Sequence, residues 1–373
     1  MIKKFLQKIF KTFSYGFFLK IYGKIEKPIQ NIDDHRITTK VVSPNDDLKY
    51  KVYKIIDGRL YTDRVHDTAV ILDDKIIEGP SFQLRYTHDS KVYNSKAKDN
   101  IVLKKGTPRR LKKLKGTVLS LLTGGGGNNN YWHWLYDVLP RLKLCEKVKK
   151  IEDINHFIFP SLEKKFQKET LDKLNIDESK ILSSKKFRHF KSNEIIFTDH
   201  PYVHTDNSHR DAQNIPEWII GWLKEKFLTD LESVKTKTPK KFFIDRTDPK
   251  SNAHRVRSIV NENEVKDFLI KKDFTYVRLH DLTFLEQVKH FNNAECIIGL
   301  HGGGFANISF CKSNTQLIEL RTEKAGTVIE NLAKKNNLNY DSLVLKPENS
   351  DYDKQSGHVK IPIDILERKI NNA

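Results

Sequence analysis

Short apolar runs alternate with segments of helical spacing through the second half of the chain. Strands are predicted at residues 241–245, 274–279, 295–300, 315–320 and 340–345. Helical spacing between these strands is found at residues 261–272, 283–291 and 326–335. Thr283 and Glu286 have the capping-box pattern of a helix start. Because no clear hairpin turn separates the strands, the alternation predicts a doubly wound, parallel α/β domain.

The first half shows the same alternation around its centre. Strands are predicted at residues 116–122, 156–160 and 193–197, with a lysine-rich helix between the last two. Another helix is expected from Tyr131, and Pro140 should kink or restart it. We therefore expect an α/β protein in which two Rossmann-like domains face each other across a cleft.

A polar connection at residues 234–240 reads as the linker between the two halves. A chain of 373 residues is long enough for two domains that each have their own core. The expected parts are a basic aromatic amphipathic segment, a first α/β domain, a second Rossmann-like domain, and a tail with a C-terminal helix. Their boundaries are set at residues 1–30, 31–235, 236–350 and 351–373.

The first 27 residues interleave seven lysines with seven aromatic residues, against the single acidic residue Glu26. The longest uncharged run there is eight residues, too short to span a bilayer, and no signal-peptide pattern is present. This pattern predicts a helix that lies on an anionic membrane surface, although packing on the protein's own surface would also explain it. Residues 104–115, with seven basic residues, form either a solvated edge or an extension of that membrane-facing surface.

The net charge of +18 calls for a polyanion or an anionic membrane as a partner. Nucleic acid is not expected, because no zinc finger, RNA-recognition signature or evident helix-turn-helix is found. The cysteines Cys145, Cys296 and Cys311 have no metal-ligand spacing, which favours a reduced compartment without structural zinc. We expect a cytoplasmic protein that associates peripherally with the inner face of a membrane.

The stretch "IIGLHGGGFANISF" has the form of a strand, a glycine turn and a helix that starts near Phe305. Glycines at Gly302–Gly304 let the backbone approach a ligand, and a helix start offers N–H groups to an anion. Arg246 follows one strand and Arg257 precedes a helix, so both should lie near the carboxyl edge of a parallel sheet. Two guanidiniums there suit a diphosphate, with Arg255 as a competitor for the role of Arg257.

Three ionisable residues lie in an apolar stretch of the first half. His133 and Asp137 are four residues apart, hence on one helical face, and Arg141 continues that stripe. Buried charges need partners, so the stripe is either a structural network or a general base that serves a cleft. Asp137 is preferred as the base because a carboxylate accepts a proton directly, with His133 orienting it or contacting the acceptor.

Glu319, near the end of another predicted strand, invites two interpretations. Its carboxylate could accept hydrogen bonds from ribose hydroxyls, or it could form a surface salt bridge.

In this order and spacing, "NNNYWHWLYDVLPRL", "DR…R…NE" and "GLHGGGFAN…IEL" resemble glycosyltransferase family 61 over roughly residues 115–345. The resemblance implies a GT-B fold and an inverting, metal-independent transfer from a nucleotide sugar, usually UDP-linked. It also implies a glycan or lipid-linked glycan acceptor in cell-surface polysaccharide (capsule) biosynthesis, with a hexosyl or pentosyl group transferred. No cofactor beyond the donor is expected.

The site residues divide between the two domains. Catalysis is assigned to Asp137 and His133, and the acceptor side to Asn130, Arg141 and His204. Nucleotide-sugar binding is assigned to Arg246, Arg257, His301, Gly302, Gly303, Gly304, Asn307 and Glu319. Two departures from the family are Gly303-Gly304-Phe305 in place of the usual "AGL" and Asp245 in place of a serine before Arg246. The run Gly124–Gly127 is also longer than the resemblance leads us to expect.

Two other functions compete with this interpretation. One is a non-catalytic, basic, membrane-attached protein that binds a polyanion. The other is a metal-dependent hydrolase built on His200, His204 and His209 with Asp199 and Asp206, although an acceptor-side loop fits their irregular spacing better. The Asp351-Tyr352-Asp353 sequence lies in the polar tail and is expected to be solvated.

Overall fold

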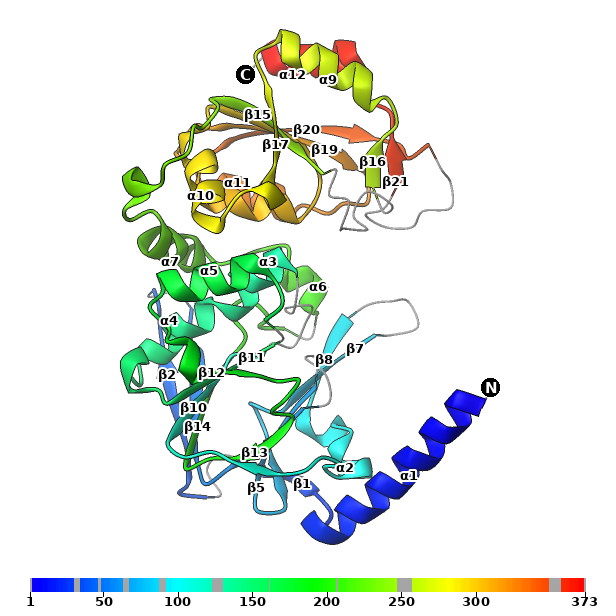
Figure 1. The fold of residues 1–373 in the computed structure, drawn as a ribbon, viewed down its shortest axis with the longest axis vertical. Helices are drawn as coiled ribbons and strands as arrows, with labels where there is room; N and C mark the ends of the chain where they lie inside the picture. The colour runs from blue at the N-terminus through cyan, green and yellow to red at the C-terminus, as the bar shows by residue number, and fades with distance from the viewer. Residues whose placement is uncertain are drawn as a thin grey trace. The chain divides into compact units, whose positions relative to one another are not determined.

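The structure is a computed structural model, and it describes residues 2–29, 34–45, 48–62, 67–86, 92–122, 130–160, 162–205, 207–246, 257–348 and 357–371. The chain forms two compact units. The first unit contains Met1–Gln167 and Asn175–Asp211, and the second contains Lys168–Leu174 and Ala212–Ala373. Each unit is an α/β structure with its own sheets (Figure 1).

One sheet of the first unit has six strands in the order β12-β11-β10-β14-β3-β2. These are β2 (Ile37–Val42), β3 (Tyr50–Ile56), β10 (Thr117–Ser120), β11 (His156–Phe159), β12 (Ile181–Ser183) and β14 (Glu194–Thr198). Strands β12, β11, β10 and β14 are parallel, whereas β3 runs antiparallel to both β14 and β2. The strands predicted at the centre of this half are confirmed as β10, β11 and β14.

A second sheet of the first unit, largely antiparallel, has no counterpart in the sequence prediction. Its strands are β1 (Glu26–Ile29), β4 (Arg59–Tyr61), β5 (Asp67–Leu72), β6 (Lys75–Ile77), β7 (Phe82–Tyr86), β8 (Val92–Ser95), β9 (Lys112–Lys113) and β13 (His189–Lys191). A shared core, which includes Leu60, Val70, Val118 and Ile195, joins it to the six-stranded sheet. The first unit is therefore a mixed α/β structure, and the prediction of a plain Rossmann-like domain is incomplete.

The helices of the first unit are α1 (Ile2–Tyr22), α2 (Val102–Lys105), α3 (Tyr131–His133), α4 (Pro140–Glu146), the start of α5 (Lys165–Lys173) and α6 (Ser208–Asp211). The predicted N-terminal helix is confirmed as α1. In the part of the chain that the structure describes, no helix combines the length and apolar character needed to cross a membrane.

The second unit is built on a five-stranded parallel sheet. Its strands are β15 (Lys241–Asp245), β17 (Thr275–Arg278), β18 (Cys296–Leu300), β19 (Gln316–Thr322) and β20 (Asn339–Leu345). The spatial order is β17-β15-β18-β19-β20, which in chain order reads 2-1-3-4-5. This is a doubly wound order, so the sequence prediction is confirmed. The short strands β16 (Arg257–Ile259) and β21 (Gly357–Val359) pair separately and were not predicted.

Helices cover both faces of this sheet (Figure 1). They are α9 (Glu262–Lys271), α10 (Phe284–Asn293), α11 (Val328–Lys335) and α12 (Ile363–Asn371), and the unit also contains α7 (Glu217–Phe227). α9 and α12 pack on one face, and α10 starts with the predicted capping box of Thr283 and Glu286. The polar connection 234–240 lies inside the second unit, because α7, which precedes it, already belongs to that unit. The ring of Phe227 in α7 packs on the ring of Phe284 in α10, with 4.8 Å between their centroids.

Candidate functional site

The helix that carries the predicted base of the first unit contains a wide turn. α3 is followed by a π-helical turn at Trp134–Val138, and α4 follows that turn. The amide of Leu139 donates to the carbonyl of Trp134, five residues earlier, at 3.1 Å. Pro140 has no N–H and its ring would clash with a carbonyl of a regular preceding turn, so the wide turn accommodates it. The helix restarts at Pro140 because of this local geometry.

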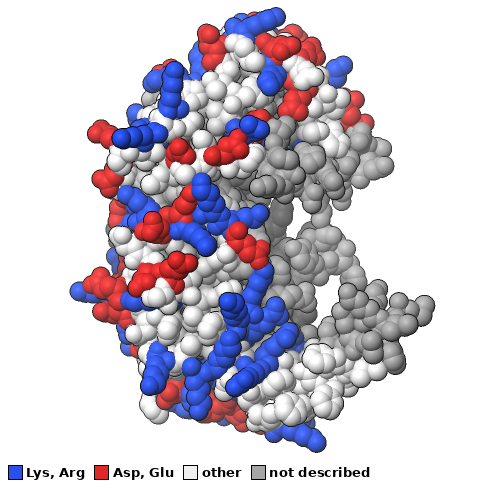
Figure 2. All heavy atoms as spheres, viewed as in Figure 1, with Lys and Arg blue, Asp and Glu red and all other residues white. Residues whose placement is uncertain are grey.

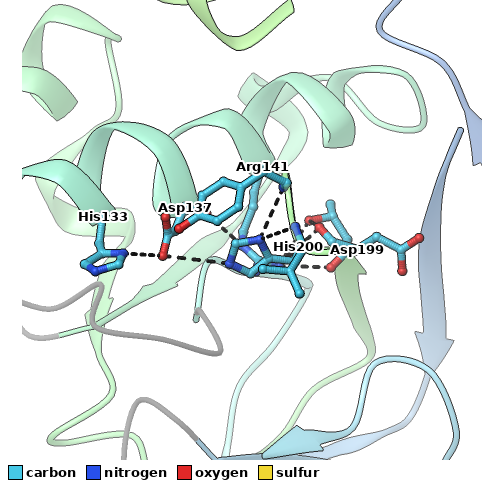
Figure 3. Close-up of polar contacts among 8 residues, drawn as sticks. His133, Asp137, Arg141, Asp199 and His200 are labelled. Carbon is cyan, nitrogen blue, oxygen red and sulfur yellow. Dashed lines mark hydrogen bonds and ion pairs between the residues drawn. The ribbon is translucent and has the colours of Figure 1, made fainter. Parts of the chain in front are cut away.

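His133 and Asp137 form a hydrogen-bonded pair across this turn (Figure 3). His133 Nδ1 lies 2.8 Å from Asp137 Oδ2, and the Asp137 side chain is 1% exposed. Burial alone would raise the pKa of Asp137, but the two neighbouring histidines hold it well below its usual range. For His133, burial lowers the pKa, but the negative charge of Asp137 and its hydrogen bond together have the larger effect and raise that pKa above the ordinary value. Asp137 is therefore ionised near neutral pH, and the proton of the pair belongs to His133.

A second histidine faces the same carboxylate oxygen from the end of β14. His200 Nε2 lies 3.8 Å from Asp137 Oδ2. His200 Nδ1 accepts from the amides of Tyr202 and Val203 at 3.3 and 3.2 Å. A nitrogen that accepts from amides carries no proton, so the neutral ring has its proton on Nε2, directed at Asp137. Burial lowers the pKa of His200 and favours this neutral form. We call His133, Asp137 and His200 the His133 cluster.

Arg141 joins the helix to the strand that carries His200. Its Nε donates to the carbonyl of Asp137 at 3.0 Å, and its Nη1 donates to the carbonyl of Thr198 at 3.0 Å. The residue is 2% exposed, and burial lowers its pKa to about 10. Arg141 therefore fixes the His133 cluster through the backbone, and its predicted contact with an acceptor stays a prediction.

The other residues assigned to the acceptor side make contacts with residues outside the His133 cluster. Asn130 caps α3 by accepting from the amide of Trp132 at 3.0 Å. The ring of His204 packs on Tyr50 at 5.2 Å. Asp206 and the run Gly124–Gly127 lie outside the described residues. Their expected roles stay predictions.

In the second unit, the predicted arginines meet where the strand order of the sheet reverses. Arg246 follows β15, and His301 follows β18, which is the neighbouring strand of the sheet although β16 and β17 come between them in the chain. Ligands of doubly wound sheets bind at the carboxyl ends of two such strands. Arg246 Nη1 donates to the carbonyl of His301 at 2.7 Å, and Arg257 Nη1 donates to the same oxygen. Two positive charges are thereby gathered on one carbonyl.

Their environment favours the approach of an anion. Burial and the charge of Arg257 lower the pKa of Arg246 to about 10. Burial also lowers the pKa of Arg257, against the opposing charge of Glu319. Nε of Arg257 is buried and has no hydrogen-bond partner among the described residues. An anion placed here would relieve the repulsion between the guanidiniums and complete their hydrogen bonding.

The glycine turn lets this arrangement form. A Cβ on Gly302 would lie 3.1 Å from Nη1 of Arg246, and one on Gly304 would lie 3.0 Å from the side chain of Leu279. Gly303 has open space at the same position. The helix expected from Phe305 is a 3-10 helix that begins at Gly303. This correction follows from the tight turn, since a 3-10 helix has fewer residues per turn than an α-helix.

Glu319 is enclosed, and each of its carboxylate oxygens is hydrogen-bonded to a neighbouring side chain. Its side chain is 0% exposed, and its Oε1 is hydrogen-bonded to Nδ1 of His301. Its Oε2 accepts from the hydroxyl of Tyr340 at 2.6 Å. In this arrangement Glu319 orients His301 and is closed off from solvent, and ribose binding remains a prediction. We call Arg246, Arg257, His301, Glu319 and Tyr340 the His301 cluster.

Asn307 is likewise buried, with its amide donating to Gln287 Oε1 at 3.1 Å. It holds the 3-10 helix against α10. Beside the two arginines, a hollow that opens to solvent has apolar walls that include Phe243, Ile259 and Leu300. Glu262 also lines it, and burial raises the pKa of this carboxyl group.

Sequence reasoning named His200 only within a competing metal cluster or an acceptor-side loop, and it did not assign Tyr340 or the hollow to the site. His200 could have been found, because it comes three residues after the strand predicted at residues 193–197, close to the carboxyl edge of the sheet. Tyr340 reaches Glu319 through the register of β19 and β20, which no local pattern reveals. Arg255 and Asp351-Tyr352-Asp353 lie outside the described residues. Within the described ranges, no group of three histidine, cysteine or acidic residues is placed to hold a metal ion.

A comparison with protein families gives the class of the chain. The model of glycosyltransferase 61 matches residues 131–318, which is half of the chain. The chain belongs to glycosyltransferase family 61. A search of curated proteins found no match. Family membership implies a glycosyltransferase that uses a nucleotide-sugar donor and a glycan acceptor, and the matched range contains both His133 and Arg246.

Proposed function

We propose that this protein is an inverting glycosyltransferase that transfers a hexosyl or pentosyl group from a UDP-linked sugar to a hydroxyl of a glycan. A glycan or lipid-linked glycan of cell-surface polysaccharide biosynthesis, such as capsule, is the proposed acceptor. The observation that carries the proposal is the convergence of Arg246 and Arg257 at the switch point of a doubly wound sheet, in a family-61 chain. That position and charge suit the diphosphate of a donor.

In this proposal the two units have separate roles, as in a GT-B glycosyltransferase. The second unit binds the donor, and the first unit activates the acceptor. The sheet order of the second unit supports the first half of this statement, and the His133 cluster supports the second.

We assign the general base to His133 and not to Asp137. Asp137 is buried and strongly held in its ionised form, so it is a poor acceptor for the proton of a hydroxyl. The His133 side chain is 30% exposed, and its Nδ1 is occupied by Asp137, which leaves Nε2 to take that proton. Asp137 then acts as a positioning residue that stabilises the charged imidazole, and His200 supports Asp137. This assignment reverses the preference from the sequence.

In the proposed reaction, the acceptor oxygen forms a bond to the anomeric carbon as the bond from that carbon to the diphosphate oxygen breaks. The acceptor proton passes to Nε2 of His133, and the bonding electrons leave with the nucleotide diphosphate. Arg246 and Arg257 stabilise the charge that develops on the leaving group. Because protein cations can do this, we propose that no bound metal is essential.

The inner, cytoplasmic face of a membrane is the proposed place of action, since a lipid-linked acceptor would be found there.

Donor binding is tested by titrating purified protein with UDP, GDP, CDP and ADP in a calorimeter, with and without EDTA. We expect one nucleotide diphosphate to bind tightly, UDP by resemblance, and EDTA to leave the affinity unchanged. The Arg246→Ala variant should lose this binding, whereas Arg368→Ala should keep it, because Arg368 is exposed and bonds only to Asp364 in the described residues. Equal binding by the parent and Arg246→Ala would remove the proposed donor site.

A further inference from the structure

The exposed face of α1 is the most apolar surface feature that the proposed reaction does not use. Phe10 and Phe13 are 70% and 73% exposed, and Ile9, Phe17 and Ile21 are each more than half exposed. These five are half of the large hydrophobic residues found exposed in the described part of the chain. Positions 9, 13, 17 and 21 repeat every four residues, and position 10 lies seven before 17, so all five share one helical face. Side chains of this size stay exposed on a soluble surface only at a cost, which a partner would remove.

The C-terminal end of α1 is fixed to the first unit, and this sets which way the apolar face points. The hydroxyl of Tyr22 accepts from the amide of Leu111 at 2.9 Å. The Tyr22 ring packs edge-on against His189, with 5.1 Å between centroids. In Figure 1 this end of α1 lies beside α2, and the other end runs away from it. The joint therefore holds the helix with its aromatic face outward.

The same joint brings a basic segment next to α1. Leu111 belongs to residues 104–115, in which Lys104, Arg110, Lys113 and Lys115 are exposed. Basic side chains gather over the lower part of the face shown in Figure 2. An apolar strip bordered by cations complements a surface that is apolar inside and negatively charged outside. A second copy of this chain fits less well, because pairing two such surfaces would bring two basic segments together.

We propose that α1 and residues 104–115 form one docking surface for an anionic lipid bilayer. The aromatic side chains enter the interfacial layer, and the basic side chains bind lipid headgroups. The helix lies in the plane of the membrane and does not cross it, in keeping with its mixed composition. This inference deepens the proposed place of action, but it stands on exposed side chains and its test does not use enzymatic activity.

The test compares three variants of the full chain by sedimentation with vesicles. The first replaces Phe10, Phe13 and Phe17 by serine, and the second replaces Lys104, Arg110 and Lys113 by serine. Lys112 is left unchanged because its ammonium group lies over the ring of Phe187 at 4.1 Å. The control replaces Val41, Ile270 and Val344 by serine, which are 56%, 53% and 48% exposed and lie elsewhere.

Vesicles of phosphatidylcholine alone are compared with equal mixtures of phosphatidylcholine and phosphatidylglycerol, at low and physiological salt. We expect the parent and the control to bind the mixed vesicles, more weakly at higher salt. The phenylalanine variant should lose roughly 1,000-fold in affinity, at about tenfold for the burial of each ring. The basic variant should lose roughly 100-fold on mixed vesicles only, at about fivefold for each cation.

Unchanged thermal unfolding of each variant will show that the fold is intact. The proposal is overturned if the parent does not bind mixed vesicles, or if the phenylalanine variant binds them as well as the control does. Light scattering decides the remaining case. A parent dimer that the phenylalanine variant converts to a monomer, without vesicle binding, would assign this face to a second copy of the chain.

Discussion

The two clusters use the same chemical pair in two different settings. In each, Nδ1 of a histidine is hydrogen-bonded to a buried carboxylate, Asp137 in the first unit and Glu319 in the second. The His133 side chain is 30% exposed, whereas that of His301 is 6% exposed. His133 thus offers its second nitrogen to a ligand, while His301 is enclosed and offers its backbone carbonyl to two arginines.

The elements that carry the histidines account for this difference. His133 lies in the first turn of a helix, where side chains project from the surface, whereas Asp137 lies in the buried π turn that follows. His301 directly follows a central strand, where neighbouring strands enclose it on both sides. The comparison teaches that a histidine–carboxylate pair moves protons only where the ring keeps a free nitrogen. Elsewhere it serves as a rigid support, here for the turn that is proposed to bind an anion.

The largest effect is expected from removing His133. His133→Ala should lower turnover by ~10²–10⁴-fold with unchanged donor affinity, since a positioned base contributes about that much. The control is His35→Ala, whose side chain is 93% exposed. Initial rates and calorimetry on the same preparations provide the measurement. If His133→Ala turned over at the rate of the parent, His133 would not be the base, and both clusters would have only a structural role.

The dependence of kcat/KM on pH is a second test of His133 as the base. A base works only when deprotonated, so the kcat/KM of the parent should rise with pH through the pKa of His133. Asp137 raises that pKa despite burial, so Asp137→Asn should move the rise to lower pH while reducing the maximum rate. A profile that stays in place would show that Asp137 does not act through His133.

The second largest effect concerns the arginines held by His301. Charge-assisted hydrogen bonds are worth ~1.5–3 kcal/mol, so Arg246→Lys should weaken the binding of a nucleotide diphosphate by roughly tenfold to 100-fold. Lysine keeps the charge but cannot contact the His301 carbonyl and a phosphate with the same planar group. The His133→Ala variant serves as the matched comparison, because it should bind the donor normally. Donor binding that responds equally to both changes would contradict the separation of roles.

A smaller effect is expected at the support itself. Glu319→Gln should lower the free energy of unfolding by about 1–3 kcal/mol, and Tyr340→Phe by about 1 kcal/mol, as buried polar groups lose partners. Urea unfolding measures both. Comparing UDP with 2′-deoxy-UDP tests the alternative role for Glu319. If Glu319 bound the ribose, the parent would discriminate between these two ligands and Glu319→Gln would not.

The smallest effect is expected at Asn130, which precedes the His133 cluster. Asn130→Ala should cost about 1 kcal/mol of stability through loss of the cap on α3, and Asn130→Ser should restore it. A raised KM for the acceptor in both variants would instead support the acceptor contact that the sequence predicts.

The five-stranded sheet was predictable because parallel strands are buried on both faces and read as continuous apolar runs. For the same reason, Arg246 and His301 could be placed at one edge before their contact was known. In the second sheet of the first unit, three-residue strands such as β4 and β6 and the two-lysine strand β9 leave too little pattern to recognise. The π turn was not predicted, because a hydrogen bond between residues five apart has no sequence pattern, and only Pro140 indicates an irregular helix here.

The role of Glu319 and the choice between His133 and Asp137 as the base could not be decided from the local sequence pattern. Burial and pairing decide which atoms remain available, and both come from register and packing. A sequence can show that His133 and Asp137 share a face, but not that Asp137 alone is enclosed.

Helix α5 is divided between the two units, which has a consequence for anyone who wishes to express the second unit alone. Residues 168–174 belong to the second unit although the rest of that unit begins at residue 212. Within it, the carboxylate of Glu169 accepts from the first amide of α10, that of Phe284, at 2.7 Å. A fragment cut at residue 212 would therefore lack a piece of its own structure. A gene in which a short linker joins residues 165–174 to residues 212–373 would keep this piece.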